Sequence, residues 1–199
     1  MRNAVLEATA DLLIESGLES VELSNVAYRA GVGKSTVYRR WGTVTALVAD
    51  LLVDMANTSA RRQSTGSLYR DLLAISRLIQ RTLADPRQGR LFAAIIAAAT
   101  CNRHTATALA GFYNARINEF CGIVLDGITR GEAPPGTDAA EVIRYLSAPL
   151  YYRMLTGNGV PDAEDATRAT NAAVAAIAAG VFITPADDAP AFSKPTSSK

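Results

Sequence analysis

Residues 23–41 read LSNVAYRAGVGKSTVYRRW, and this stretch decides the fold of the chain. Small apolar residues recur at helical spacing through its first half, so one side of that segment can pack on a core. Gly31 then supplies the left-handed backbone conformation that ends a helix without a Cβ penalty. A second short helix begins at Lys34, with Val37 and Trp41 one turn apart on its inner side. The stretch is therefore predicted to form two short helices around a tight turn.

The outer side of the second predicted helix carries cations and hydroxyl groups. Residues 28–41 contain three arginines, one lysine and no acidic residue. Such a helix offers hydrogen-bond donors to phosphate oxygens, and an arginine can reach guanine with two bonds. The composition is typical of a helix-turn-helix motif with its recognition helix. The candidate DNA contacts on this helix and just beyond it are Lys34, Ser35, Thr36, Tyr38, Arg39, Arg40 and Thr43.

Residues 30–41, AGVGKSTVYRRW, resemble the helix-turn-helix of the tetracycline-repressor (TetR) family of bacterial transcription regulators. They are most similar to the branch whose recognition helix ends in Tyr-Arg-Arg-Trp. VLEATADLLIESG at 5–17 resembles the first helix of that family, and TALVADLL at 45–52 resembles the start of its fourth. APLYYRMLTG at 148–157 resembles a segment of the ligand-binding domain in the same branch.

This resemblance implies an all-α protein of about nine helices, with an N-terminal three-helix DNA-binding head joined by the fourth helix to a helical ligand-binding and dimerisation body. The expected head is residues 1–45 and the expected body is residues 46–184. The resemblance also implies a repressor that binds a palindromic double-stranded operator as a homodimer and is released by a small-molecule inducer. The matching family positions are phosphate contacts, here Lys34, Tyr38 and Arg40, and positions closest to base edges, here Ser35, Thr36 and Arg39.

Two positions depart from the usual pattern of the family. Threonine is usual where this chain has Glu22, and glutamate is a poorer helix N-cap, although its charge suits a helix N-terminus. A lysine that contacts a DNA phosphate is usual where this chain has Val44. We therefore expect one contact fewer with the DNA backbone and an unchanged mode of binding. The basic arm that often precedes the first helix is reduced to Arg2.

Composition restricts the class of protein. The chain has 199 residues, 49% of them hydrophobic, and a net charge of +1, so any nucleic-acid contact depends on local clustering. Two cysteines, Cys101 and Cys121, and the single His104 make neither a disulfide framework nor a structural zinc site, and no metal or cofactor is predicted. No apolar run is long enough for a membrane span, and acidic residues interrupt any signal peptide. We expect a reduced, cytoplasmic protein without a membrane partner.

The remainder of the chain favours helices, because alternation is rare and alanine and leucine recur at helical spacing. Pro86 is predicted to end the helix that begins near residue 68. Asp138 and Glu141 are predicted to form a capping box, and Asp162 to cap the last helix. Beyond residue 184 the chain has three prolines among serine, aspartate and lysine, which predicts a disordered tail at 185–199.

Residues 172–181, AAVAAIAAGV, are apolar nearly all round and are expected at the centre of the last helix. Such a helix is either buried within its own domain or shared with a partner. In the family, the last two helices build a four-helix dimer interface, and residues 138–154 and 172–182 match that placement. The resemblance thus implies a homodimer held by these two segments, and burial within one chain is the alternative.

The family places its inducer pocket among the helices of the body, where this chain has several large or polar side chains. For each aromatic candidate, a plain core position is the alternative. Arg116 is a separate case, because a cation between Phe112 and Phe120 must find an acid, a ring face or a ligand anion. The candidate ligand contacts are Cys101, Phe112, Tyr113, Arg116, Phe120, Tyr151 and Tyr152.

Two other classes of function are alternatives to a DNA-binding regulator. A helical ligand-binding module with a vestigial DNA head would account for the body, but the intact basic residues between 34 and 40 argue against it. An enzyme would need a nucleophile and a base, or several acids and a histidine, at a defensible spacing, and none is visible.

Overall fold

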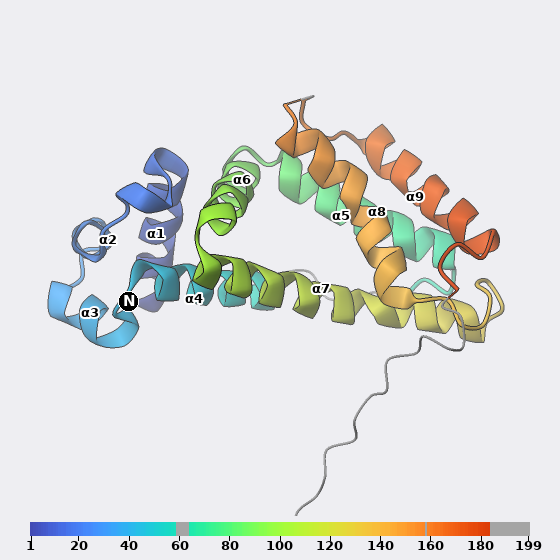
Figure 1. Cartoon of the computed structure of the whole chain (residues 1–199), viewed down its shortest axis with the longest axis horizontal. Coiled ribbons are helices and arrows are strands. Elements are labelled where there is room, and N and C mark those ends of the chain that lie inside the picture. The colour runs from blue at the N-terminus through green and yellow to red at the C-terminus, as the bar shows by residue number, and fades with distance from the viewer. Residues whose placement is uncertain (59–63, 158, 184–199) are drawn as a thin grey trace, which may run out of the picture.

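The computed structural model describes residues 1–58, 64–157 and 159–183, and these residues form nine α-helices (Figure 1). Within these ranges there is no strand, only an isolated bridge between Thr137 and Ile183. The all-α prediction is confirmed, whereas the tail predicted at 185–199 lies outside the described residues. The helices are α1 (Arg2–Ser16), α2 (Leu23–Arg29), α3 (Lys34–Trp41), α4 (Val44–Thr58), α5 (Leu68–Ala84), α6 (Pro86–Cys101), α7 (Arg103–Thr129), α8 (Ala139–Leu155) and α9 (Ala163–Ala178), with a 3-10 turn η1 (Leu18–Ser20) after α1.

The head is formed by α1, α2 and α3, which lie together at one end of the molecule (Figure 1). Its core contains Leu13, Val26 and Val37, all of which are buried. Gly31 follows α2 with φ +64°, in the left-handed region that its position in the sequence predicted. The two short helices around a turn are confirmed. From this end α4 leads into the body and lies along α7.

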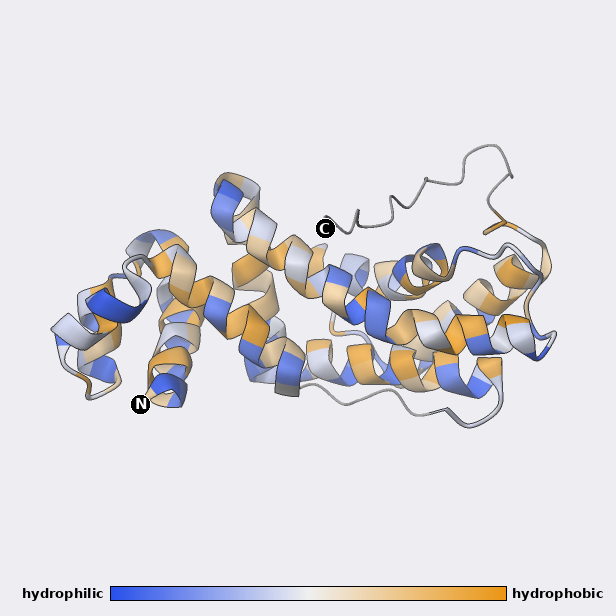
Figure 2. Ribbon diagram, turned by 90° about the horizontal axis from the view of Figure 1, so that it is seen from below, coloured by the Kyte–Doolittle hydropathy of each residue, from blue (hydrophilic) through white to orange (hydrophobic). Residues whose placement is uncertain are grey.

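The body contains α5 to α9, with α8 packed against both α7 and α9, and α5 packed against α9. Its core includes Leu72 of α5, Val124 of α7, Leu146 of α8 and Ile177 of α9. Hydrophobic residues recur along each of these helices and alternate with hydrophilic ones (Figure 2), as expected where one side of a helix faces a core. The helices thereby form a bundle that extends away from the head.

The helix ends follow the sequence with two corrections. Asp138 caps α8 through two backbone N–H groups, but the Glu141 carboxylate pairs with Arg144 at 2.6 Å instead of completing a capping box. Residues 172–181 are not the centre of the last helix, because α9 ends at Ala178 and Gly180 follows with φ +72°. They are the C-terminal part of α9 and the turn after it.

The corner between α5 and α6 depends on Gly89. A Cβ at this position would lie 2.3 Å from the carbonyl oxygen of Leu83, closer than any normal contact. Gly89→Ala is expected to destabilise the fold by about 1–3 kcal/mol, because the backbone must move to admit the methyl group. Gly111→Ala on α7 is the matched control, since its Cβ would meet no atom within 4 Å and alanine should stabilise the helix by about 0.5–1 kcal/mol. Denaturant unfolding followed by circular dichroism measures both, and a Gly89→Ala variant as stable as wild type would contradict this packing.

Candidate DNA-reading surface and ligand cavity

Helix α3 has one buried side and one exposed side. Val37 is fully buried and Trp41 is half-buried against the head. In the described part of the chain neither Lys34 nor Arg39 has an acidic partner, so both charges are available to a polyanion. The guanidinium of Arg40 lies over the Trp41 ring, 4.9 Å from its centroid. Of the predicted DNA contacts, Thr36 is half-buried and the others are exposed, namely Lys34, Ser35, Tyr38, Arg39, Arg40 and Thr43.

Asp50 of α4 is hydrogen-bonded both to the end of α3 and to the start of α1. Its carboxylate accepts hydrogen bonds from Trp41 Nε1 at 2.9 Å and from Arg2, with Nη2 at 2.8 Å and Nε at 3.2 Å. Arg2 also pairs with Asp54, one turn further along α4. The Arg2 guanidinium, followed by the Trp41 N–H, lowers the pKa of the Asp50 carboxyl below its ordinary value. Arg2 is thus engaged in ion pairs that join α1 to α4.

The lowered pKa of Asp50 predicts how this junction depends on pH. A carboxyl whose pKa is lower in the folded state stabilises the fold above its unfolded-state pKa, and this contribution is lost as the pH falls through the folded-state value. Asp50→Asn is therefore expected to lower the free energy of unfolding by about 1–2 kcal/mol at pH 7, with the difference from wild type disappearing as the pH falls below the ordinary pKa of an aspartate. Trp41 is the single tryptophan, so its fluorescence can follow denaturation across this range. Glu19→Gln, at an exposed acid, is the control, and a constant Asp50→Asn deficit at every pH would contradict the ionic role.

The two departures from the family pattern have structural consequences. Glu22 is the N-cap of α2 but accepts no bond from a backbone N–H of the helix, and its carboxylate instead accepts a bond from the Ser24 hydroxyl at 3.0 Å. The prediction of a poor cap is confirmed. At the start of α4 the Thr43 hydroxyl accepts a bond from the Ala46 N–H at 3.1 Å, and Val44 packs against the core. Val44 therefore contributes packing at the position where the family's lysine contributes charge.

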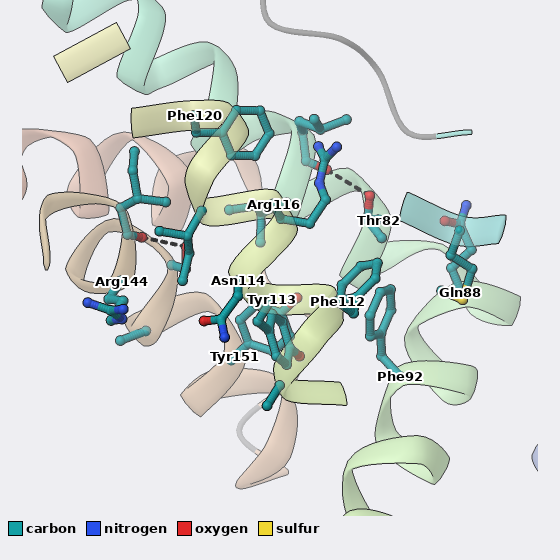
Figure 3. A pocket seen from close by; sticks show the side chains of 18 residues that line it. Thr82, Gln88, Phe92, Phe112, Tyr113, Asn114, Arg116, Phe120, Arg144 and Tyr151 are labelled. Atoms are coloured by element: carbon teal, nitrogen blue, oxygen red, sulfur yellow. Dashed lines mark hydrogen bonds between the residues drawn. The ribbon is translucent and has the colours of Figure 1, made fainter. Parts of the chain in front are cut away.

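A cavity of about 630 Å³ lies within the body between α4, α5, α6, α7 and α8 (Figure 3). Its volume falls in the range of roughly 300–1,000 Å³ that is usual for small-molecule sites. The predicted ligand contacts Phe112, Tyr113, Arg116, Phe120 and Tyr151 lie on its wall. The other lining residues are Met55, Leu78, Ile79, Thr82, Gln88, Phe92, Ala110, Asn114, Ile117, Ile143, Arg144, Ser147 and Ala148.

The other two predicted ligand contacts lie elsewhere. Tyr152 is 68% exposed on the outer side of α8. Consecutive residues of a helix point about 100° apart, and Tyr151 takes the inward direction. Cys101 is exposed at the end of α6, beside a separate hollow of about 570 Å³ between η1, α4 and α6. Neither side chain lines the body cavity.

One end of the cavity is an aromatic wall. The ring centroids of Phe92 and Phe112 are 5.7 Å apart, those of Phe112 and Tyr113 are 5.4 Å apart, and those of Tyr113 and Tyr151 are 5.6 Å apart. All three pairs are tilted or edge-to-face, the arrangements that aromatic quadrupoles favour. Burial raises the pKa of both the Tyr113 and the Tyr151 phenol. Both tyrosines therefore stay neutral at physiological pH.

Arg116 lies elsewhere on the wall, toward Phe120 and Thr82 (Figure 3). Its side chain is only 12% exposed, and Nη1 pairs with Glu119 at 2.6 Å. The guanidinium also lies over the Phe120 ring, 4.5 Å from the centroid. Of the three partners that the sequence left open for this cation, the protein itself supplies an acid and a ring face. Phe112 and Phe120 are core residues, 8% and 5% exposed, as well as lining residues, so the two interpretations do not exclude each other.

Helix α6 connects the cavity with the head, and the sequence did not predict this connection. Arg87 in its first turn pairs through Nη2 with Glu7 at 2.5 Å and Asp11 at 2.8 Å, both on α1. Gln88 beside it and Phe92 one turn later line the cavity. Periodicity marks Phe92 as inward-facing, but no sequence signal shows where a core leaves space. In the sequence, only the i to i+4 spacing of Glu7 and Asp11 indicated that the first helix could bind a cation such as Arg87.

In the described residues no cluster of three or more His, Cys, Asp or Glu side chains could hold a metal ion. No helix in these residues is both long enough and apolar enough to cross a membrane.

Comparisons with known proteins match both parts of the chain. The family model for bacterial regulatory proteins of the tetR family matches residues 5–51, and that for the tetracyclin repressor-like C-terminal domain matches residues 62–173. The HTH-type transcriptional regulator YdeS of Bacillus subtilis (strain 168) is 30% identical over 161 residues, which cover 80% of this chain and 81% of YdeS. AqdR of Rhodococcus erythropolis, also an HTH-type regulator, is 28% identical over 161 residues, covering 80% and 77%. The crystal structure of the TetR family regulator SCO0332 superposes with a TM-score of 0.68 at 26% identity, covering 87% of this chain and 96% of that one.

Proposed function

Because this chain belongs to the tetracycline-repressor (TetR) family of bacterial transcription regulators, we propose that it is a repressor that binds a palindromic operator as a homodimer and leaves it when a small molecule fills the body cavity. The chain is a helix-turn-helix transcriptional regulator, and regulators of this family bind DNA and small-molecule ligands, usually as dimers. The observation that carries the proposal is the exposed basic side of α3, where Lys34 and Arg39 lack an acidic partner among the described residues.

We assign the chain to the branch whose recognition helix ends in Tyr-Arg-Arg-Trp. The exposed side of α3 would enter the major groove, as in other helix-turn-helix proteins. Thr43, exposed just beyond α3, would add a phosphate contact. On α3 itself the proposed phosphate contacts are Lys34, Tyr38 and Arg40, and the proposed base-edge contacts are Ser35, Thr36 and Arg39.

The division of the chain follows from these roles. Residues 1–45 would form the DNA-binding head and residues 46–184 the ligand-binding and dimerisation body, with α4 as the connection. Since the DNA of bacteria lies in the cytoplasm, the protein would act there. Neither a cofactor nor a metal has a part in this function.

Ligand would act by shifting a population between two arrangements of the head. The cavity wall includes Met55 of α4 and Gln88 of α6, and both helices lead to the head. Arg87 ties the first turn of α6 to Glu7 and Asp11 of α1. A ligand that moves this turn would therefore change the orientation of the head. The resulting spacing of the two recognition helices would no longer fit consecutive major grooves.

The dimer would form through α8 and α9. Tyr145, Tyr152 and Leu155 of α8 are 60%, 68% and 50% exposed, a large apolar surface for one helix. On α9 the exposed side carries small residues, including Ala172 and Ala175, that allow close approach of another helix. The two surfaces are adjacent because α8 packs against α9.

Two rival functions are less well supported. A ligand-binding module without DNA binding leaves the unpaired cations of α3 without a role. An enzyme is disfavoured because the cavity wall, as far as the chain is described, contains no Asp, Glu, His or Cys. Footprinting on the DNA around the protein's own gene tests the proposal. We expect a protected palindrome with half-sites about 34 Å apart, and failure to protect any site would reject a DNA-binding function.

A further inference from the structure

The polar side chains on the cavity wall are hydrogen-bond donors or neutral groups, and none is acidic. Arg116 and Arg144 are the charged residues of the described lining, and both are cations. Arg144 is paired with Glu141 and its side chain is 47% exposed, so water screens its charge. Arg116 is the less exposed cation, at 12%. A cationic ligand would find no counter-charge on this wall.

The guanidinium of Arg116 has more N–H groups than its hydrogen bond to Glu119 uses. A guanidinium carries five N–H groups, and in the described part of the chain the structure gives Arg116 one hydrogen bond, from Nη1 to Glu119. The Phe120 ring holds the guanidinium plane in place without using an N–H group. Glu119 is 31% exposed and is not a lining residue, so it leaves the cavity side of the guanidinium open.

The tyrosine pair adds a second donor at the aromatic wall. Tyr113 and Tyr151 both line the cavity, and each phenol carries an O–H that can donate to an acceptor. Thr82 and Ser147 differ, because their hydroxyls donate to the carbonyls of Leu78 and Ile143. The wall thus offers N–H and O–H donors beside a cluster of aromatic rings.

From this arrangement we infer that the ligand is an aromatic anion, a ring system with a carboxylate or sulfonate group that Arg116 receives. The rings would pack on Phe92 and Phe112, and the tyrosine pair would donate to a neutral acceptor on the same skeleton. The inference rests on the proposed function, because it names the chemical class of the ligand for the same cavity.

Two fluorescent probes with the same skeleton test the charge preference. N-phenyl-1-naphthylamine is neutral, and 1-anilinonaphthalene-8-sulfonate adds one sulfonate to it. A merely apolar cavity prefers the neutral probe, because the sulfonate must lose its water. We expect the full-length protein to bind the sulfonate at least about tenfold more tightly, the effect of a charge-assisted hydrogen bond.

Variants of the ion pair should change this preference in opposite directions. Arg116→Gln is expected to remove it, and Arg116→Lys to keep part of it. Glu119→Gln frees the guanidinium from its acid and is expected to increase it. Arg144→Gln is the matched control at the other arginine of the wall and should change the preference little. A purely structural role of the pair would weaken both probes alike in Arg116→Gln and Glu119→Gln.

Each outcome is decisive. Equal or tighter binding of the neutral probe, or a sulfonate preference that survives Arg116→Gln, overturns the inference while leaving the cavity as a ligand site. Ser147→Trp, which places an indole at a half-buried position of the cavity wall, should abolish binding of both probes. If both probes bind this variant as they bind wild type, or if neither binds the wild-type protein, the cavity is not the ligand site and the proposed function fails with the inference. Circular dichroism confirms that each variant is folded.

Discussion

Arg39→Ala is expected to cost roughly 1–3 kcal/mol of affinity for the operator and to relax the preference at one base pair of each half-site. Arg39 is exposed on α3 and has no acidic partner in the described residues, so its guanidinium can make two bonds to a guanine. Binding to scrambled DNA should weaken much less, because non-specific binding depends on phosphate contacts. Titrations of both DNAs, monitored by fluorescence anisotropy, measure the two affinities.

Lys34→Ala is the contrasting variant on the same helix. Loss of a phosphate contact should weaken operator and scrambled DNA alike and reduce the slope of log affinity against log salt by about one. Arg77→Ala, at an exposed arginine of α5 far along the chain from α3, is the control and should alter neither quantity. If Arg39→Ala weakens both DNAs equally while Lys34→Ala changes only the sequence preference, the two roles are reversed. If neither variant changes binding, α3 does not read DNA.

The fold of the head could be predicted from the sequence because local signals agree there. Gly31 requires a turn, and Val37 and Trp41 mark the inner side of α3 whatever the rest of the chain does. Residues 172–181 show the limit of such signals. A run of alanines lacks the side-chain contrast that locates a helix end, and Gly180 was the only local sign that α9 stops.

The candidate cavity could be predicted only in part. The sequence placed Phe112 and Arg116 one turn apart on one helix, and both lie on the wall. It could not separate Tyr151 from Tyr152, since neighbouring residues of the same type give no sign of which one points inward. The ion pair between Arg2 and Asp50 also could not be predicted from the sequence, because it joins residues 48 positions apart through the packing of α1 on α4. Contacts of this kind depend on tertiary structure.

The second prediction with a large expected effect concerns the proposed dimer interface on α8 and α9. If α8 and α9 form the proposed dimer interface, Ala175→Arg is expected to give monomers at micromolar concentration, because a buried unpaired charge costs several kcal/mol and the twofold axis introduces two of them. Ala176, the next residue of the same apolar run, is not suitable for this test. The structure packs Ala176 against the core of its own chain, so a charge there would disturb the fold itself. Ala175 is exposed, so a charge at this position tests dimer assembly without disturbing the fold of the chain.

Sedimentation equilibrium measures the expected change, and Ala74→Arg is its control. Ala74 is exposed on the side of α5 that already carries Arg70 and Arg77, where one more charge stays in water. Monomeric Ala175→Arg should also lose affinity for the full operator and keep the weak binding of a single half-site, since each head alone retains its α3. A variant that unfolds at the wild-type temperature and sediments as the wild-type dimer would place the interface away from this part of α9. A variant that is monomeric yet binds the full operator like wild type would instead show that DNA brings the two heads together without α9.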